Sequence, residues 1–447
     1  MSITKKYIGQ LYLPSRFYLI GGFIVVLYIV AYFYKPFFII PQTASYLFFF
    51  LTFLDYCFLF FFGATPEAER KVSERMSNGD ENIVKLNVVS NFRFPIQLLI
   101  IDELPFQFQM RDWQLKYFFK AGEEKQLKYI LRPSERGQYQ FGNIILYASS
   151  LLNLVVRRFD IEAQKSIAVY PSFLQLRKYE LLSHTTIQSE QGNKRMRKIG
   201  HSMEFEQIKE YVRGDDVRTI NWKATARKSA LMVNNYTDER SQQVYCIIDK
   251  GRLMKMPFGG LSLLDYAINA TLVLSNVCLQ KQDKVGLITF AQKMGTLLPA
   301  DRKPIQRANM LQLLYNQGTD FLEPDYEMLY LQLRSRVKQR SLLILFTNFE
   351  SLSGLKRQLN YLRAISKHHL LLVVFFENTE LNRLGNIEGD ELEKVYVKTI
   401  AEKFAYEKRL IVKELLHHGI LSLLTPPDKL TVNALNKYLE LKARQAI

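Results

Sequence analysis

The residues that could do chemistry in this 447-residue chain concentrate in one charged stretch, residues 202–227. Two adjacent carboxylates, Asp215 and Asp216, precede Arg218 there. A pair of carboxylates can act as general acid and general base when both converge in one cleft. Adjacent side chains usually diverge, and one carboxylate that caps a helix is the simpler interpretation. We therefore favour a structural network of paired charges, with a docking surface as the main alternative and catalysis as the third.

The apolar spacing in this stretch predicts two short helices. Three apolar residues recur at i, i+3 and i+7, which gives a helix one face to bury: Phe205, Ile208 and Val212. Ser202 can cap this helix and Gly214 can end it. Asp215 or Asp216 then caps a second helix that carries Arg218, Trp222, Lys223 and Arg227. We expect the Trp222 ring to be buried between two soluble domains.

The stretch resembles the signature of the domain of unknown function 58 family of bacterial proteins. The resemblance is carried by Glu204, Phe205, Ile208, Lys209, Tyr211, Gly214, Asp215, Asp216, Arg218, Ile220, Trp222, Lys223, Ala226 and Arg227. The family usually has Gly, Arg and Asp where Ser202, Lys209 and Asn221 stand. The resemblance assigns no activity. It implies an AAA+ ATPase of the MoxR group as a partner, because the genes of the two often occur together.

Composition points to a membrane rather than to nucleic acid. The net charge of +17 fits a basic protein beside anionic lipid. The sequence has no recognised nucleic-acid reader motif and no basic strip interleaved with aromatic residues. Three cysteines, Cys57, Cys246 and Cys278, are scattered without metal-ligand spacing and give no support for a disulfide framework.

Two apolar runs, residues 17–34 and 44–63, are each about long enough to span a bilayer. They predict a transmembrane hairpin over residues 17–63, through which copies of the chain could also assemble. Basic residues flank the hairpin on both outer sides, and they are Lys5, Lys6, Arg16, Arg70, Lys71 and Arg75. Positive charge stays on the cytoplasmic side of a membrane. We therefore expect a bacterial inner-membrane protein with residues 1–16 and the soluble body in the cytoplasm.

Asp55 lies inside the second apolar run. A carboxylate at that depth is costly, so a functional role or a specific partner is the default hypothesis. The alternative that we prefer is a protonated group, or one that is hydrogen-bonded to a neighbouring helix.

Residues 70–173 predict a small antiparallel β-sandwich. Apolar and polar residues alternate over residues 83–89 and, more loosely, over 127–131, as in half-buried strands. Short strands between frequent turns are typical of sandwiches. The family often has an Asp-Pro-x-Gly-Leu turn where residues 150–154 read SLLNL, so the loop there should differ. Residues 174–242 form a charged connector and the signature.

Strands and helices alternate over residues 243–447, which predicts a doubly wound α/β domain. We expect strands at residues 244–248, 285–290, 295–298, 342–346, 370–376 and 421–424, and helices at residues 263–280, 305–315, 326–338, 355–367, 392–417 and 432–444. The layout resembles a von Willebrand factor A domain. His368-His369 and His417-His418 each precede an apolar strand, where solvated turn residues are common.

That second resemblance implies a magnesium site at the carboxyl edge of the sheet, with an Asp-x-Ser-x-Ser loop, a distant Thr and a late Asp. Here Asp249 is kept, Gly251 and Leu253 replace the two hydroxyl residues, and Asn348 replaces the late acid. Thr319 is the candidate threonine. Magnesium requires hard oxygen ligands in near-octahedral geometry. We expect no working metal site, no cofactor, and a structural role for Asp249 in capping the following loop or pairing with a neighbouring base.

Together these features predict a membrane-anchored cytoplasmic scaffold that docks protein partners and is not an enzyme. Two other classes stay open. One is a hydrolytic enzyme that uses Asp215, Asp216 and Arg218, and the other is a metal-dependent protein-binding domain.

Overall fold

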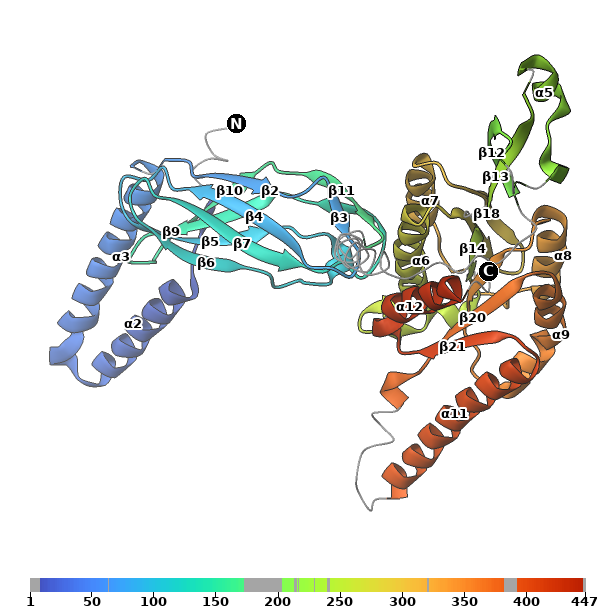
Figure 1. Ribbon diagram of the computed structural model, residues 1–447. Helices are drawn as coiled ribbons and strands as arrows, with labels where there is room; N and C mark the ends of the chain where they lie inside the picture. The colour runs from blue at the N-terminus through green and yellow to red at the C-terminus, as the bar shows by residue number, and fades with distance from the viewer. Residues whose placement is uncertain are drawn as a thin grey trace. The chain divides into compact units, whose positions relative to one another are not determined.

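The computed structural model describes residues 9–62, 64–172, 203–212, 215, 217–228, 230–238, 242–319, 321–381 and 392–444. The chain divides into two compact units, Met1–Tyr170 and Pro171–Ile447. The first unit holds a helix pair and a β-sandwich, and the second holds the signature and an α/β domain (Figure 1).

Both apolar runs are helices, as predicted. Helix α2 (Ser15–Phe33) and helix α3 (Ile39–Phe60) are joined by the 3₁₀ turn η1 (Lys35–Phe38). Both are long and apolar enough to cross a membrane, and large apolar side chains such as Phe23, Tyr32 and Phe49 are exposed along them. Exposure of so much apolar surface on two helices is unfavourable in water and favourable in lipid.

Three sheets form the sandwich that follows. The first has the order β1 (Leu11–Tyr12), β10 (Val156–Ile161), β9 (Ile144–Ser149), β5 (Ile96–Asp102) and β6 (Leu115–Phe119). The second is β2 (Glu67–Lys71), β4 (Asn82–Val89) and β7 (Glu124–Leu131), and the third is β3 (Arg75–Ser77), β11 (Lys165–Tyr170) and β8 (Gly137–Phe141). Alternate residues of β4 enter one core shared with the other sheets. The two strands predicted by alternation, β4 and β7, are confirmed.

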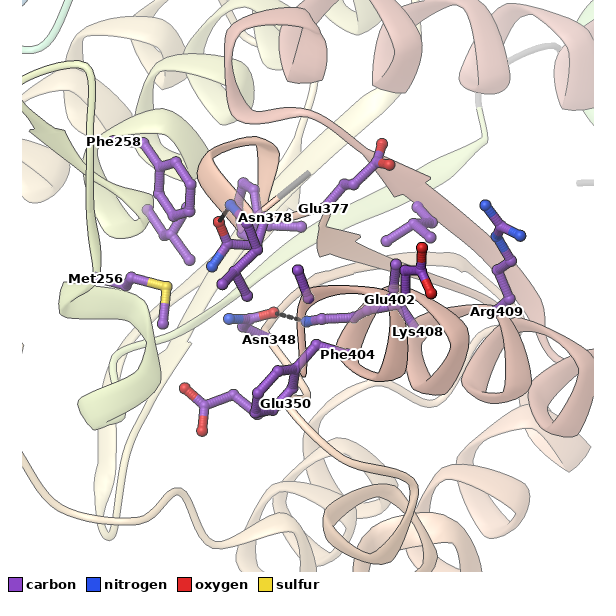
Figure 2. A pocket seen from close by; sticks show the side chains of 16 residues that line it. Met256, Phe258, Asn348, Glu350, Glu377, Asn378, Glu402, Phe404, Lys408 and Arg409 are labelled. Atoms are coloured by element: carbon purple, nitrogen blue, oxygen red, sulfur yellow. Dashed lines mark hydrogen bonds between the residues drawn. The ribbon is translucent and has the colours of Figure 1, made fainter. Parts of the chain in front are cut away.

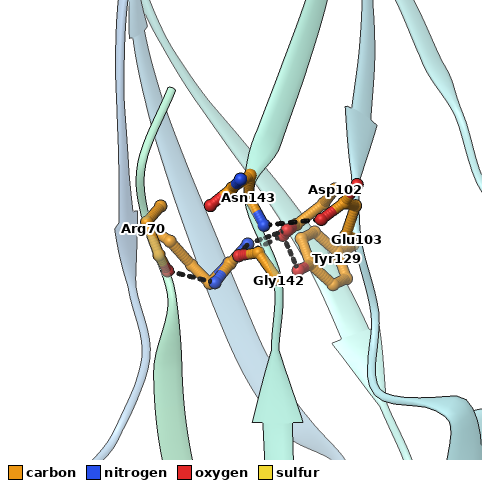
Figure 3. A network of polar contacts seen from close by, with 7 residues as sticks. Arg70, Asp102, Glu103, Tyr129, Gly142 and Asn143 are labelled. Carbon is orange, nitrogen blue, oxygen red and sulfur yellow. Dashed lines mark hydrogen bonds and ion pairs between the residues drawn. The ribbon is translucent and has the colours of Figure 1, made fainter. Parts of the chain in front are cut away.

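A buried polar network crosses this sandwich (Figure 3). Arg70 donates to both carboxylate oxygens of Asp102, to the Ala163 carbonyl at 2.7 Å and to the Gly142 carbonyl at 3.0 Å. The Tyr129 hydroxyl donates to the same carboxylate, and burial beside Asp102 raises the pKa of Tyr129. Arg70 is therefore paired inside the sandwich and is not a solvent-exposed base beside the helix pair.

The second unit contains a six-stranded sheet in the order β18 (Met294–Asp301), β17 (Lys284–Phe290), β14 (Gln243–Asp249), β19 (Leu342–Phe346), β20 (Leu370–Phe376) and β21 (Leu421–Thr425). All neighbours are parallel except β18, which is antiparallel to β17. The parallel strands are nearly continuous apolar runs because both of their faces are covered. Each of the strands predicted for this domain is confirmed.

Helices cover the two faces of this sheet. On one face pack α6 (Leu263–Gln280), α7 (Ile305–Tyr315) and α12 (Leu430–Ala443), and on the other α8 (Tyr326–Arg336), α9 (Leu352–His368) and α11 (Leu392–His417). The bounds of α6, α7 and α11 equal the predicted ones. This is the doubly wound arrangement that the alternating pattern predicts.

The first predicted signature helix is wrong. Residues Met203–Glu210 form strand β12, which pairs antiparallel with β13 (Met232–Asp238), and the register shifts between Phe205 and Gln207. A partner strand more than twenty residues away, with buried Met232 and Val233, overrides the local helical spacing. The second predicted helix exists as α5 (Trp222–Lys228), after the 3₁₀ turn η3 (Val217–Thr219). Ser202 and Gly214 lie outside the described residues.

We predict that Asp102→Ala destabilises the sandwich by about 3–5 kcal/mol, because the buried Arg70 guanidinium loses its counter-charge. Urea unfolding of the detergent-solubilised chain, in a Trp222→Phe background, measures this loss through Trp113, whose ring lies 4.4 Å from that of Tyr129. The matched control is Asp160→Ala, which breaks an exposed pair with Arg158 and should cost about 0–1 kcal/mol. Equal losses in the two variants would contradict the prediction.

Candidate functional site

Asp249 ends strand β14 and lies buried at the carboxyl edge of the sheet. Its Oδ2 accepts a hydrogen bond from the Thr347 hydroxyl, and its Oδ1 accepts one from the Gly251 N–H, both at 2.7 Å. Burial raises the pKa of Asp249 to about 6, although both hydrogen bonds oppose the rise. The carboxylate caps the loop that follows it, which is one of the two structural roles expected.

The loop after Asp249 has no room for a serine at position 251, where the Asp-x-Ser-x-Ser loop has its first serine. A Cβ on Gly251 would lie 2.7 Å from Cδ of Pro324 and 3.0 Å from Oδ1 of Asp249, so a serine cannot stand there without movement. Arg252 turns away from Asp249 and pairs with exposed Glu323. The hydroxyl beside Asp249 belongs to Thr347, and no hydrogen bond between described residues joins it to Thr319.

A lysine ammonium lies at the same carboxyl edge, beside the residues that follow β19. Lys408, from α11, is only 8% exposed, and its Nζ donates to Oδ1 of Asn348 at 2.7 Å and to the Phe349 carbonyl. No ion pair joins it to a carboxylate within the described part of the chain. Burial lowers its pKa to about 8, against a smaller opposing effect of Glu350. A buried amine held only by neutral oxygens is thus the main cation at this edge.

These residues do not fit a magnesium ion. Gly251 and Leu253 contribute no side-chain oxygen, and the Asn348 oxygen already accepts from an ammonium. Among the described residues, no cluster of three or more His, Cys, Asp or Glu side chains could hold a metal. Magnesium needs several hard oxygens at fixed angles, and one buried carboxylate cannot supply them.

A cavity of about 490 Å³ opens beside Lys408 (Figure 2). It lies beyond the carboxyl ends of β19 and β20, where doubly wound folds bind ligands. Met256 and Phe258 line one side, and the α11 residues Phe404 and Lys408 line another. Sequence reasoning missed Lys408, yet a signal was present, since it precedes buried Ile411 and Leu415 by three and seven residues on the apolar face of α11.

In the signature, Asp215 contacts residues close to it in the sequence. Its Oδ1 lies 2.9 Å from Lys209 Nζ and its Oδ2 accepts from the Val212 N–H at 3.0 Å. These contacts, the backbone hydrogen bond first, lower the pKa of Asp215. We predicted Asp215 or Asp216 as the cap of this helix, but Asn221 caps α5, because its Oδ1 accepts from the Ala224 N–H at 3.0 Å. Asp216 lies outside the described residues.

The Trp222 ring, which we expected to be buried between two soluble domains, is not part of the core of its own unit. Trp222, the first residue of α5, is 71% exposed. Among the residues whose burial the structure describes, the other large apolar side chains exposed between Ile208 and Leu231 are Ile208, Val212, Val217 and Leu231. Lys223 and Arg227 are exposed beside them on α5, Tyr211 is half-buried, and Glu204 and Phe205 lie in β12. Among the described residues, Trp222, Lys223 and Arg227 therefore belong to the surface of the second unit.

Asp55 is fully buried where α3 meets the sandwich. Its Oδ2 accepts from the backbone N–H groups of Leu154 and Val155, both at 2.9 Å. The partner is therefore a loop of the sandwich, which fits the default hypothesis of a specific partner, and it is not the neighbouring helix of the alternative that we preferred. Asn153 takes a left-handed φ of 52°, so this loop turns without the usual glycine, and Leu154 packs against Ile24 and Phe48 of the helix pair.

Asp249→Asn should change how stability depends on pH. A carboxyl whose pKa is about 6 in the fold and 3.8 ordinarily binds its proton more tightly when folded, so its ionisation costs stability as pH rises through this window. The variant has no such ionisation. Its free energy of unfolding, relative to that of the wild type, should therefore rise by about 3 kcal/mol between about pH 4 and about pH 7. Urea unfolding at several pH values tests this. A pH-independent difference between the two proteins would refute the assignment.

Comparisons with known proteins found several to which this chain is similar. The chain is similar to the uncharacterized protein YeaD of Bacillus subtilis (strain 168), with 24% identity over 124 residues, 28% of this chain and 31% of YeaD. Among solved structures it is similar to the conserved hypothetical protein BatB of Bacteroides thetaiotaomicron, with 17% identity, a TM-score of 0.31, and coverage of 46% of this chain and 100% of that one. The CARDB domain of the PF1109 protein of Pyrococcus furiosus aligns at 13% identity and a TM-score of 0.17, over 24% of this chain and 92% of that one. Residues 207–409 match the family described as Protein of unknown function DUF58, which confirms the resemblance read from the signature.

Proposed function

We propose that this protein is a membrane-anchored scaffold whose signature docks a protein partner, and that it is not itself an enzyme. The observation that carries the proposal is the exposure of Trp222 together with Val212 and Val217. Isolated exposed apolar side chains are ordinary, but a group of them within one short hairpin is typical of an interaction surface. Tryptophan is also enriched among the residues that dominate binding energy at protein interfaces.

The charged residues of the signature support docking more than catalysis. Asp215 is held by Lys209 and by the Val212 N–H, in a turn rather than in a cleft. A hydrolytic pair would need two carboxylates that converge on a substrate. The lowered pKa of Asp215 also makes it a poor proton donor near neutral pH. A metal-dependent binding mode is disfavoured by the poor ligand set around Asp249.

The α/β domain that follows is, in this proposal, von Willebrand factor A-like. Numbered along the chain, its strands have the order 3-2-1-4-5-6 with an antiparallel edge strand, and this supports the assignment. The MoxR-type AAA+ ATPase is the partner that we propose, and its support is the family resemblance alone. The signature would present the apolar group around Trp222 to this ATPase.

The membrane anchor is the α2–α3 hairpin, in the inner membrane of a bacterium with the body in the cytoplasm. Its support is the length and apolar surface of both helices. The sandwich loop adds to it, because Leu151 is 70% and Leu152 44% exposed where the loop meets the helices. Two apolar side chains at such a loop tip suit the hydrocarbon layer better than water.

Trp222→Ala should abolish most partner capture without loss of stability. Loss of an exposed central aromatic residue typically weakens an interface by about tenfold or more, whereas exposed substitutions change stability by about 0.5 kcal/mol or less. A pull-down of the full chain from native membranes with the candidate ATPase, and a thermal melt, measure the two effects. The control is Tyr396→Ala on α11, where the side chain is 68% exposed. Undiminished capture by the Trp222 variant would remove the docking surface from the proposal.

The orientation has its own test. A protease added to sealed, right-side-out cells should leave the body after residue 63 intact, because it lies on the cytoplasmic side. The same protease should digest the body once the cells are opened. Digestion from outside in sealed cells would overturn the orientation and leave the docking test unaffected.

A further inference from the structure

A second cavity, of about 390 Å³, lies at the opposite edge of the α/β sheet from Lys408. It forms where α8 and α9 end and where β19 and β20 begin. Its charged and titratable lining residues, apart from Tyr330, are all basic: Arg334, Lys338, Arg340, His368 and His369. No acidic residue lines it, in contrast to the first cavity, which has glutamates at positions 350, 377 and 402.

The ordinary explanation for these bases is the helix dipole. Helices α8 and α9 both end here, and basic residues favourably face the partial negative charge of a helix C-terminus. Each end carries roughly −0.5 of a charge, so the two ends carry about −1. Arg334, Lys338 and Arg340 are permanently positive and exceed that amount by roughly two charges. The dipoles therefore account for only part of the positive charge.

That surplus is not neutralised by nearby carboxylates. Among the described residues, no ion pair joins Arg334, Lys338 or Arg340 to an acidic group, and Arg334 Nη1 donates to the Tyr330 hydroxyl at 3.3 Å. Arg444 and Lys437, by contrast, both form ion pairs with Glu440. The cavity thus presents two guanidinium groups and an ammonium with capacity for an anion.

A buried imidazole gives the second, independent indication. His369 was expected in a solvated turn, yet it is only 7% exposed. Its Nδ1 is buried and has no hydrogen-bond partner among the described residues, although the His369 backbone N–H is satisfied by the Ile365 carbonyl at 3.1 Å. A buried polar atom without a partner is unfavourable. An oxygen of a bound anion would supply the missing contact to Nδ1–H.

We propose that this basic cavity binds a phosphate group through Arg334, Lys338, Arg340 and the imidazole of His369. Guanidinium groups bind phosphate oxygens through paired hydrogen bonds. Arg334, Lys338 and Arg340 are exposed and so accessible to a ligand, whereas His369 is buried at the base of the group. The phosphate belongs either to a small soluble compound or to a phospholipid headgroup. The site is independent of the proposed docking surface, since it uses no residue of the signature.

The test uses the full chain in neutral detergent at physiological ionic strength, with histidine labelled for NMR. The chain has six histidines, so the His368 and His369 ring signals can be assigned with single His→Gln variants. Inorganic phosphate and a short-chain phosphatidylglycerol are titrated separately. We expect a saturable shift of the His369 signal with at least one probe. A shift with phosphate alone identifies a soluble ligand, and one with the lipid alone identifies a headgroup.

Variants decide whether the cavity is responsible. Arg334→Gln with Arg340→Gln should weaken binding about tenfold or more, because each charge-assisted hydrogen bond contributes strongly. Lys338→Gln gives a smaller loss and serves if the double variant does not fold. The matched control is Arg363→Gln, an exposed base of α9 outside the cavity, which should leave binding within about twofold of wild type. No saturable shift with either probe, or equal weakening by Arg363→Gln, would overturn the proposal.

Discussion

The hydrogen bonds from the backbone of Leu154 and Val155 to Asp55 hold the first unit of this protein together. They fix a loop of the sandwich against the helix pair at residues that belong to no strand, so these N–H groups have no partner in a sheet. In an apolar layer every backbone N–H must be satisfied from within the protein, because no water is available. The carboxylate of Asp55 does this for two consecutive N–H groups, which explains why a charged residue interrupts an apolar helix.

Neighbouring contacts make this junction firm. Arg157 donates to the Leu59 carbonyl at 3.0 Å and lies over the rings of Phe60 and Phe159. The end of α3 is thereby joined to strand β10 as well as to the loop. In the second unit, basic residues also lie at the two edges of the sheet without a carboxylate partner among the described residues. Buried Lys408 is held by neutral oxygens at one edge of the sheet. Arg334, Lys338 and Arg340, which have no ion-pair partner among the described residues, lie at the other edge.

The regular elements of the α/β domain were predictable because strong local signals agreed with tertiary burial. The apolar run of β20 and the Ser262 cap of α6 each specify one outcome. The signature was not predictable in the same way. Its apolar spacing fits a helix, but the chain returns 24 residues after Ile208 to pair β12 with β13, and a single sequence does not reveal such a distant partner.

The site residues fall into the same two groups, those placed by local sequence signals and those placed by distant packing. Asp249 and Asn348 were located correctly at the carboxyl edge because Asp249 ends one apolar strand and Asn348 lies two residues after another. The roles of Lys408 and His369 depend on burial by elements remote in sequence, so residue type alone suggested solvent. Trp222 differs from both, since large aromatic residues are usually buried and the core of the second unit does not hold this ring.

The junction at Asp55 also sets an order of biogenesis. Asp55 precedes Leu154 by 99 residues, so the helix pair is synthesised well before the loop whose N–H groups satisfy this side chain. Until the sandwich folds, Asp55 lacks its final hydrogen-bond donors, which is costly in an apolar environment. Folding of the sandwich therefore completes this end of the helix pair, so the two parts of the first unit reach their final structure together.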